Sequence, residues 1–253
     1  MRKGLDSSVK ICVLAMLLVS LCFVCSCKKS EPAPGDPGTK SPGKEPGKDV
    51  AKPSGDLVPL DLELPKPMFV GTPQDTKVDN LEKPLGRPRG PFLAPKGTTN
   101  VADGKAVSSS DEEPIIGEIE MITDGDKEAA DGSYVELGPF RQDVTVDLEA
   151  VHSIYAIVVW HYHKQARVYF DVVVQVADDA DFITNVQTVF NNDTDNSVGL
   201  GVGKDKHYTE TNEGKLIDAK GVKGRYVRFY SKGNTSNDLN HYIEVAVYGK
   251  PAQ

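Results

Sequence analysis

The chain has 253 residues and a formal net charge of −8, but its charged residues are unevenly distributed. The part from Val101 to Lys250 holds 26 acidic and 14 basic side chains, a net charge of −12, whereas Lys28 to Lys96 holds 10 acidic and 12 basic ones, a net charge of +2. The acidity of the C-terminal part argues against nucleic-acid binding, because phosphate contacts need clustered Lys and Arg. It can instead concentrate divalent cations.

Residues 1–26 are predicted to be a signal peptide for export. Three basic residues precede an apolar run from Ile11 to Val24, which is too short and wrongly flanked for a membrane span. The folded part of the chain has no disulfide, no thiolate metal site and no cysteine nucleophile, because all the cysteines lie in or next to this first segment. They are Cys12, Cys22, Cys25 and Cys27.

The signal ends in Val24-Cys25-Ser26-Cys27. This ending resembles that of a bacterial lipoprotein signal, which has an aliphatic residue, two small residues and the Cys that receives the lipid. The resemblance implies that Cys27 is the lipidated N-terminus of a mature protein anchored to a membrane of the bacterial cell envelope. An ordinary secretory signal that is cut nearby is the alternative.

Residues 27–55 are predicted to be a disordered tether, and residues 56–98 an extended, proline-rich segment. The tether consists mainly of Pro, Gly, Lys and Glu, with almost nothing apolar to bury. The second segment carries apolar side chains, but its prolines forbid a regular helix or a central strand. Either it packs on the folded domain, or it is a linear motif that binds a protein partner. The side chains expected to pack are Leu60, Leu62, Met68 and Phe69.

Residues 99–250 are predicted to fold as one all-β domain. Short runs rich in Val, Ile, Tyr and Phe recur, separated by turn signals such as Asp-Gly, and no helical period of any length appears. Eight such runs indicate an eight-stranded antiparallel β-sandwich or jelly roll. The predicted strands are Ala106–Ser110, Tyr134–Leu137, Val144–Leu148, two central runs within Ile154–Asp179, Gln187–Phe190, Tyr226–Tyr230 and Tyr242–Tyr248.

The two central runs within Ile154–Asp179 are predicted to be long adjacent strands joined by the polar loop 163–167. Along the first run, the even-numbered residues from 154 to 160 are expected on one face and residues 155, 157 and 159 on the other. Both faces are apolar, so a second layer must cover the outer one. The proline-rich segment 56–98 is the natural candidate.

Six short motifs follow one another along residues 100–250. They are Asn100–Ser110, Ile122–Asp126, Val144–Leu148, Ile154–Trp160, Gly224–Arg228 and Ile243–Gly249. In this order they resemble discoidin-type domains, the galactose-binding-like modules of the coagulation factor 5/8 C-terminal type, which include many family 32 carbohydrate-binding modules. The resemblance implies a non-catalytic, eight-stranded jelly roll that binds sugars or other surface ligands through loops at one end. The Cys pair that closes many eukaryotic members is missing here.

The same resemblance implies a structural Ca²⁺ ion held by the Asp-Gly loop and by a Glu of the last strand. In this chain those positions are Asp124, Asp126 and Glu244. Ca²⁺ takes six to eight hard oxygen ligands, and a tight Asp-Gly turn presents carboxylates and carbonyls together. The alternative is that Asp124 only initiates a turn.

His161 and His163 follow the first central strand two residues apart, so they are expected to project on one face. Three interpretations stay open: a sugar-contacting edge, a transition-metal site completed by His207 or His241, or polar residues that face solvent. Imidazole, guanidinium and Tyr side chains suit the first, because they bond hydroxyls and stack on pyranose faces. The predicted ligand-binding residues are His161, His163, Arg167, His241 and Tyr242.

The chain carries none of the signatures of a serine-hydrolase elbow, a zinc-protease helix, a phosphate-binding P-loop or a dinucleotide fold. The sequence therefore predicts a non-catalytic, lipid-anchored module that recognises a carbohydrate or another surface ligand. The alternative is a structural or assembly lipoprotein that binds a protein partner.

Overall fold

The computed structural model describes residues 56–68 and 76–252, all of which belong to one compact unit, residues 51–253. The predicted signal peptide, the lipidated Cys27 and the tether lie outside the described residues. Within the described ranges, no helix is long and apolar enough to cross a membrane. A single short 3-10 helix, η1 (Ile119–Thr123), accompanies the strands there.

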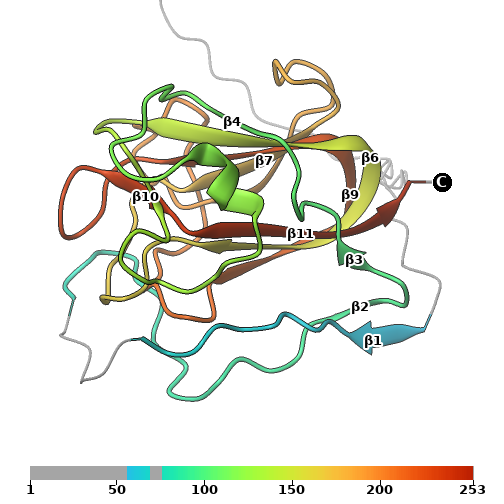
Figure 1. Ribbon diagram of the computed structural model, residues 1–253, viewed down its shortest axis with the longest axis horizontal. Coiled ribbons are helices and arrows are strands. Elements are labelled where there is room, and N and C mark those ends of the chain that lie inside the picture. Colours follow the sequence, from blue (N-terminus) through green and yellow to red (C-terminus); the bar gives the residue numbers. More distant parts are fainter. Residues whose placement is uncertain (1–55, 69–75, 253) are drawn as a thin grey trace, which may run out of the picture. The chain divides into compact units, whose positions relative to one another are not determined.

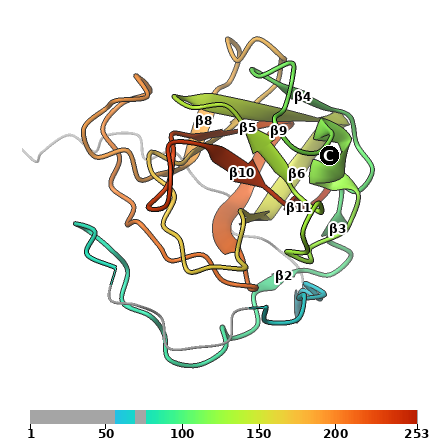
Figure 2. The same ribbon diagram turned by 60° about the vertical axis from the view of Figure 1, so that its left-hand side comes forward.

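The described residues form an antiparallel β-sandwich, as the sequence predicts (Figures 1 and 2). One sheet has the strand path β3-β11-β6-β9-β7-β8, with β4 paired to β6, and two small sheets pair β1 with β2 and β5 with β10. The strands are β1 Leu57–Pro59, β2 Leu93–Pro95, β3 Thr99–Asn100, β4 Val107–Ser109, β5 Val135–Leu137, β6 Gln142–Trp160, β7 Val173–Ala177, β8 Gln187–Asn191, β9 Lys215–Ser231, β10 Asn240–Tyr242 and β11 Glu244–Pro251.

Two long strands, β6 and β9, are shared by both layers of the sandwich. The first part of β6 pairs with β4 and its last part with β11, while β9 follows it along both. The register shifts between Asp147 and His152, where Glu149 has a positive φ of 66°. A bulge of this kind bends a strand and lets it pass from one sheet to the next. The predicted strands Val144–Leu148 and Ile154–Trp160 are therefore one continuous strand.

The prediction that the two central runs are adjacent strands is wrong. Strand β9 lies between β6 and β7, and Val173–Ala177 pairs with Tyr226–Tyr230. Hydrophobic alternation identifies a strand but not its partner, which is set by packing between distant parts of the chain. The second run is also shorter than predicted, because Val168 and Tyr169 make only isolated bridges, to Thr209 and Asn234.

The main hydrophobic core lies between the two layers. It combines side chains from both halves of β6 with residues of β7, β9 and β11, such as Val174, Phe229 and Val247. Ile154 belongs to this core together with Ile157, and not to the face that carries Ala156. The predicted alternation fails at this point because the register shifts between Ile154 and Ala156.

A second hydrophobic cluster covers the outer face of β6 and β11. Its fully or nearly buried members include Val158, Trp160 and Tyr248. We call the described residues of the proline-rich segment, 56–68 and 76–98, the strap. The strap packs four apolar side chains on this cluster, as predicted for three of them, whereas Phe69 lies outside the described residues. These side chains are Leu60, Leu62, Met68 and Phe92.

Polar contacts fix the strap to the loop before β9. The backbone N of Arg89 donates to the Glu213 carboxylate at 3.1 Å, and its guanidinium donates to the carbonyl oxygens of Glu213 and Gly214 at 2.8 and 3.0 Å. Nδ2 of Asn212 donates to the Pro65 carbonyl at 2.9 Å. The strap is therefore an integral layer of the domain, and it reaches the end of the sandwich at which β6 ends.

Candidate functional site

The five predicted ligand-binding residues gather at one end of the sandwich, where β6 ends and β11 begins. His161, His163, His241 and Tyr242 are at most 2% exposed, and Arg167 is half-buried. The interpretation that the two first histidines face solvent is therefore wrong. The expectation that His161 and His163 project on one face also fails. Strand β6 ends at Trp160, so the alternation of side chains between two faces stops before these residues.

His161 is held by a carboxylate that the sequence analysis missed. Its Nδ1 lies 2.8 Å from Oε1 of Glu210, and neither side chain is exposed. Its ring stacks on Tyr169 at 4.3 Å between centroids and contacts Tyr242 at 5.0 Å. A carboxylate accepts hydrogen bonds, so Nδ1 of His161 carries a proton. Nε2 has no partner among the described residues.

His163 and His241 are fixed in the same way. Nε2 of His163 lies 3.0 Å from the Lys127 carbonyl oxygen, and Nε2 of His241 lies 2.8 Å from Oε2 of Glu136. Burial, followed by the nearby Arg167, lowers the pKa of His241 to about 3, so its ring is neutral at ordinary pH. In the His241 ring Nδ1 is therefore an acceptor. The Nδ1 atoms of His163 and His241 both lack a partner in the described part of the chain.

Buried polar atoms without a protein partner are concentrated at this end. Of the ten such side-chain atoms among the described residues, seven belong to this cluster of side chains. Buried polar groups in folded proteins are almost always bonded, so a concentration of unbonded ones marks a place where another molecule completes the hydrogen bonds. The seven atoms are His161 Nε2, His163 Nδ1, Arg167 Nε and Nη1, Tyr169 Oη, Glu210 Oε2 and His241 Nδ1.

Aromatic rings surround these polar atoms. Tyr134 and Tyr162 lie 4.9 Å apart between ring centroids, and the guanidinium of Arg167 lies 4.7 Å from the Tyr162 centroid. Burial raises the pKa of Tyr169, so its hydroxyl stays protonated and can donate as well as accept. In the sequence, only the position of Tyr162 between the two histidines indicates weakly that it belongs to the site. Nothing in the sequence indicates this for Tyr169 or Glu210.

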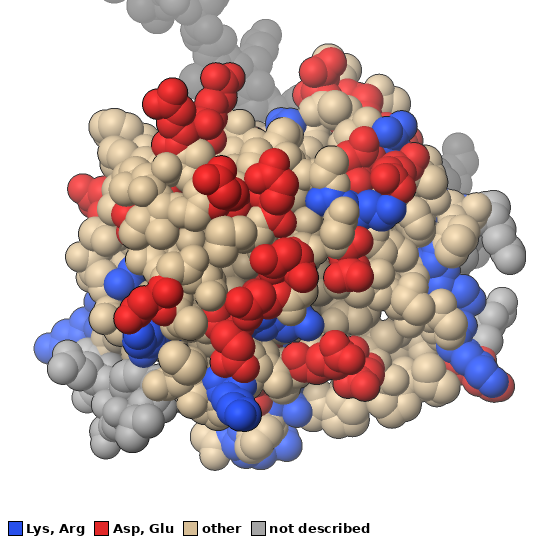
Figure 3. Space-filling view, viewed as in Figure 1, with Lys and Arg blue, Asp and Glu red and all other residues tan. Residues whose placement is uncertain are grey.

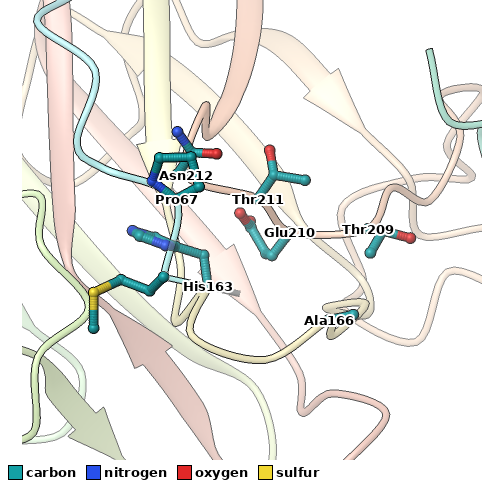
Figure 4. Close-up of a pocket in the computed structure, with 8 residues that line it drawn as sticks. Pro67, His163, Ala166, Thr209, Glu210, Thr211 and Asn212 are labelled. Atoms are coloured by element: carbon teal, nitrogen blue, oxygen red, sulfur yellow. The ribbon is translucent and has the colours of Figure 1, made fainter. Parts of the chain in front are cut away.

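A pocket of about 170 Å³ opens beside this cluster, between the strap and the loop 209–212. Pro67 and Met68 of the strap line it together with His163 and Glu210. Figure 4 shows the residues that line this pocket, with Pro67 beside Asn212 and with Thr211 and Glu210 on the neighbouring loop. The strap therefore supplies part of the wall of the candidate site.

The predicted calcium residues are only partly brought together. Glu244 is fully buried, and its Oε2 accepts a hydrogen bond from the Gly125 backbone N at 3.2 Å, while Oε1 has no partner among the described residues. Asp124 is exposed and its Oδ1 accepts from the backbone N of Asp126 at 2.8 Å. Asp126 in turn accepts from Glu128 N at 2.9 Å. Both aspartates therefore shape the turn.

The electrostatics around Glu244 favour a positive charge. Burial raises the pKa of Glu244 to about 8, and the negative charges of Asp124 and Asp103 also raise it, against the opposing effects of the Gly125 hydrogen bond and of Lys127. Within the described ranges, three acidic ligand atoms come within 4.8 Å of one another only at Asp171, Asp193 and Asp195. That group is satisfied by its own loop, since Ser197 donates to all three carboxylates.

A scan against protein-family models found no match, and a search of curated proteins found no relative. The chain is similar to a solved family 89 glycoside hydrolase from Clostridium perfringens in complex with 2-acetamido-1,2-dideoxynojirmycin (17% identity over 60% of this chain and 15% of that chain, TM-score 0.44). It is also similar to the family 32 carbohydrate-binding module of AlyQ in complex with 4,5-unsaturated mannuronic acid (20%, 56% and 92%, TM-score 0.41).

A third similar structure is a fucose-binding module from Streptococcus pneumoniae (17% identity over 59% of this chain and 97% of that chain, TM-score 0.42). The chain thus spans about 15% of the hydrolase but nearly all of each binding module. The last two belong to the class that the discoidin-type resemblance indicates.

Proposed function

We propose that the protein is a non-catalytic binding module that recognises a carbohydrate at the end of the sandwich where β6 ends. The observation that carries this proposal is the concentration of seven unbonded, buried polar atoms among aromatic rings. Sugars offer many hydroxyl groups, each of which can donate to an imidazole nitrogen or accept from a guanidinium. Tyr rings such as Tyr134 and Tyr162 add apolar surface with a polar tip.

The test is a glycan array probed with the full chain, followed by calorimetry on the glycans that bind. The variant His163→Phe keeps the size of the ring and removes one acceptor, so binding should weaken by about tenfold, the effect of one lost hydrogen bond. Lys164→Met, at a half-buried neighbour paired with Asp131, is the matched control and should leave affinity unchanged. An array without any bound glycan would contradict the proposal.

A second candidate function, binding of a protein partner, is favoured by the outer surface of the strap. Four of its leucines expose between 45% and 66% of their surface, namely Leu57, Leu64, Leu85 and Leu93. Exposed apolar groups on one segment are typical of partner-binding surfaces. Replacing Leu64 and Leu85 with Ser would abolish partner capture by this surface while leaving sugar binding intact.

We also propose that the chain is held on a membrane of the cell envelope through a lipid on Cys27, because its first segment has the form of a lipoprotein signal. Two acyl chains supply the hydrophobic free energy for stable anchoring that one acyl chain does not. Cys27→Ser should move the protein from the detergent phase to the aqueous phase on phase separation. A variant that stays in the detergent phase would disprove the anchor.

Finally, we propose a Ca²⁺ ion beside Glu244. The fit rests on the buried, unbonded Oε1 of Glu244 and on the nearby negative charges of Asp103 and Asp124. Hard carboxylate and carbonyl oxygens are the ligands that Ca²⁺ prefers. The face shown in Figure 3 carries mainly acidic charged side chains, which would raise the local concentration of cations. When bound, the ion would neutralise this cluster and join the loop 124–126 to the start of β11.

A further inference from the structure

Strand β8 forms an unpaired edge of the large sheet. Among the described residues it is the last strand of the sheet path and pairs only with β7. On its other side, its backbone is bonded only at the last residue, where Asn191 N donates to Oδ2 of Asp205 at 2.7 Å and Asn191 O accepts from Asp205 N at 3.0 Å. An unpaired sheet edge is a template for association with another chain.

This edge has little of the protection that sheet edges usually carry. Strand β8 contains no charged residue and no Pro, and a bulge that leaves Val189 without a partner in β7 is its one protective device. Apolar side chains are exposed beside it instead. Ile183 is 80% exposed, Val202 66% and Val186 36%. Exposed apolar groups along one edge are typical of a surface that another chain covers.

A groove of about 290 Å³ opens beside β8, between residues 188–191 of the strand and the glycine-rich loop 200–205. The loop lies close to the strand at Gly203, where an added Cβ would lie 2.3 Å from the Asn191 carbonyl oxygen. The groove therefore suits an aliphatic side chain of a partner. The apolar residues that line it are Val189, Phe190, Leu200 and Val202.

Exposed charges of opposite sign lie at the two ends of β8. Asp178 and Asp181 precede the strand, in the loop that projects from the sandwich at the upper right of Figure 1. Lys204 and Lys206 lie at its other end, on either side of the residue that bonds Asn191. None of these four charges takes part in an ion pair with another described residue.

A second copy of the chain in antiparallel orientation matches this charge pattern. A two-fold axis across β8 places the start of each strand beside the end of the other, so Asp181 of each copy faces Lys204 of the other. A parallel arrangement would bring like charges together. The same rotation brings Ile183, four residues before the strand, toward the groove of the other copy.

We infer that two copies of this chain associate across the unpaired edge of β8 in antiparallel orientation, with Ile183 of each copy in the groove of the other. Every contact then occurs twice, because the two copies use the same surface. Apolar burial supplies the free energy of association, and the opposite charges set the orientation. The inference goes beyond the carbohydrate-binding function and does not depend on it.

The first test is sedimentation equilibrium of the full chain in a density-matched detergent, at about 1 to 100 μM. The chain should show a monomer–dimer equilibrium. Ile183→Asp places a charge in each apolar groove, so it should raise the dissociation constant at least about 100-fold. Ile115→Asp, at another exposed isoleucine that lies beside β5, is the matched control and should leave it unchanged. A monomer at every concentration, or a dimer that survives Ile183→Asp, would overturn the inference.

The second test reverses the charges at the two ends of β8. Asp181→Lys and Lys204→Glu should each weaken the dimer about 3- to 10-fold, because each variant brings like charges together in both halves of the interface. The double variant should recover most of the loss, since it exchanges the two signs. A double variant as weak as the two losses combined would overturn the antiparallel arrangement.

The third test locates the contact with a carbodiimide, which condenses a carboxylate and an amine to an amide with loss of water. In a mixture of unlabelled and isotope-labelled full chains, the peptide with Asp181 should be joined to the peptide with Lys204 in pairs that carry one label. Cross-links found only between peptides of the same label would place this contact within one copy and overturn the inference.

Discussion

Two buried glutamates at the same end of the sandwich have different surroundings. Each is almost completely buried, with one carboxylate oxygen bonded and the other without a partner in the described ranges. Glu210 meets the imidazole of His161 at 2.8 Å, whereas Glu244 meets only a backbone N–H, that of Gly125, at 3.2 Å. Burial raises the pKa of Glu244 to about 8, and the negative charges of Asp124 and Asp103 raise it further.

Burial alone therefore does not determine what a carboxylate can bind. Glu210 is bonded to the imidazole of His161 and lines a pocket whose walls include Pro67, Met68 and Ala166. Glu244 lies in a negative field next to backbone groups, so it suits a metal cation or keeps its proton.

Breaking the His161–Glu210 pair should destabilise the protein most. In His161→Phe the ring can still stack on Tyr169, but Glu210 is left buried without its donor, which should lower the free energy of unfolding by about 3–5 kcal/mol. Denaturant unfolding of the full chain measures it. Adding Glu210→Leu should recover most of the loss. His241→Phe should cost less, because its partner Glu136 is partly exposed.

The second-largest effect concerns Glu244, which should make the free energy of unfolding depend on pH. Its pKa is about 8 in the folded state and near 4.5 when unfolded, so the folded state keeps a proton that the unfolded chain loses between these values. In chelator the free energy of unfolding should therefore fall by roughly 2–4 kcal/mol as the pH rises from about 5 to 8. Ca²⁺ or Glu244→Gln should each flatten this slope. A slope that is the same in the Gln variant would assign it to other groups.

Strap variants should have a smaller effect on the free energy of unfolding. They test whether the strap and the calcium site are independent. Phe92 is half-buried in the second hydrophobic cluster, so Phe92→Ala should lower the free energy of unfolding by about 1–2 kcal/mol. Leu93→Ala, at an exposed neighbour, should lower it by less than about 0.5 kcal/mol. Neither variant should change the stabilisation by Ca²⁺, since Phe92 packs in the second hydrophobic cluster and Leu93 is exposed. Loss of the calcium response in Phe92→Ala would show that the sites are coupled.

The smallest effect concerns the exposed Asp124. Asp124→Asn removes a negative charge that raises the pKa of Glu244, so this pKa should move down from about 8, and the change in stability should stay below about 1 kcal/mol. The carboxyl resonance of Glu244 in an NMR titration reports it. Asp126→Asn is the matched control, because Asp126 bonds its own loop and does not perturb Glu244. Equal shifts in both variants would contradict this assignment.

The sequence predicted the all-β class well, because runs such as Val144–Leu148 and Gln187–Phe190 alternate and end at turn residues. It missed the first half of β9, where charged residues and two glycines between Lys215 and Arg225 hide the strand. It also missed that β9 separates β6 from β7. Strand neighbours depend on contacts between residues far apart in the chain, which a local pattern does not contain.

The candidate site was predicted only in part, for a related reason. His161, His163, Arg167, His241 and Tyr242 are polar or aromatic residues next to strong strand signals, and the structure brings them together. Glu210 was missed because it stands in a polar loop with no pattern around it, and its meeting with His161 bridges 49 positions of the chain. The sequence also could not predict that the strap forms a wall of the pocket, because this depends on packing between distant parts of the chain.

The course of the strap determines how the binding end is presented. Its first described residue, Asp56, accepts a hydrogen bond from Lys96 N at 3.0 Å, and Lys96 O accepts one from Lys250 at 3.0 Å. Lys250 and Glu244 lie near the two ends of β11 (Figure 1). At about 3.4 Å per residue, the strand therefore places them about 20 Å apart. The pocket beside the end of β6 therefore lies at the opposite end of β11 from Asp56, the residue at which the described part of the chain begins.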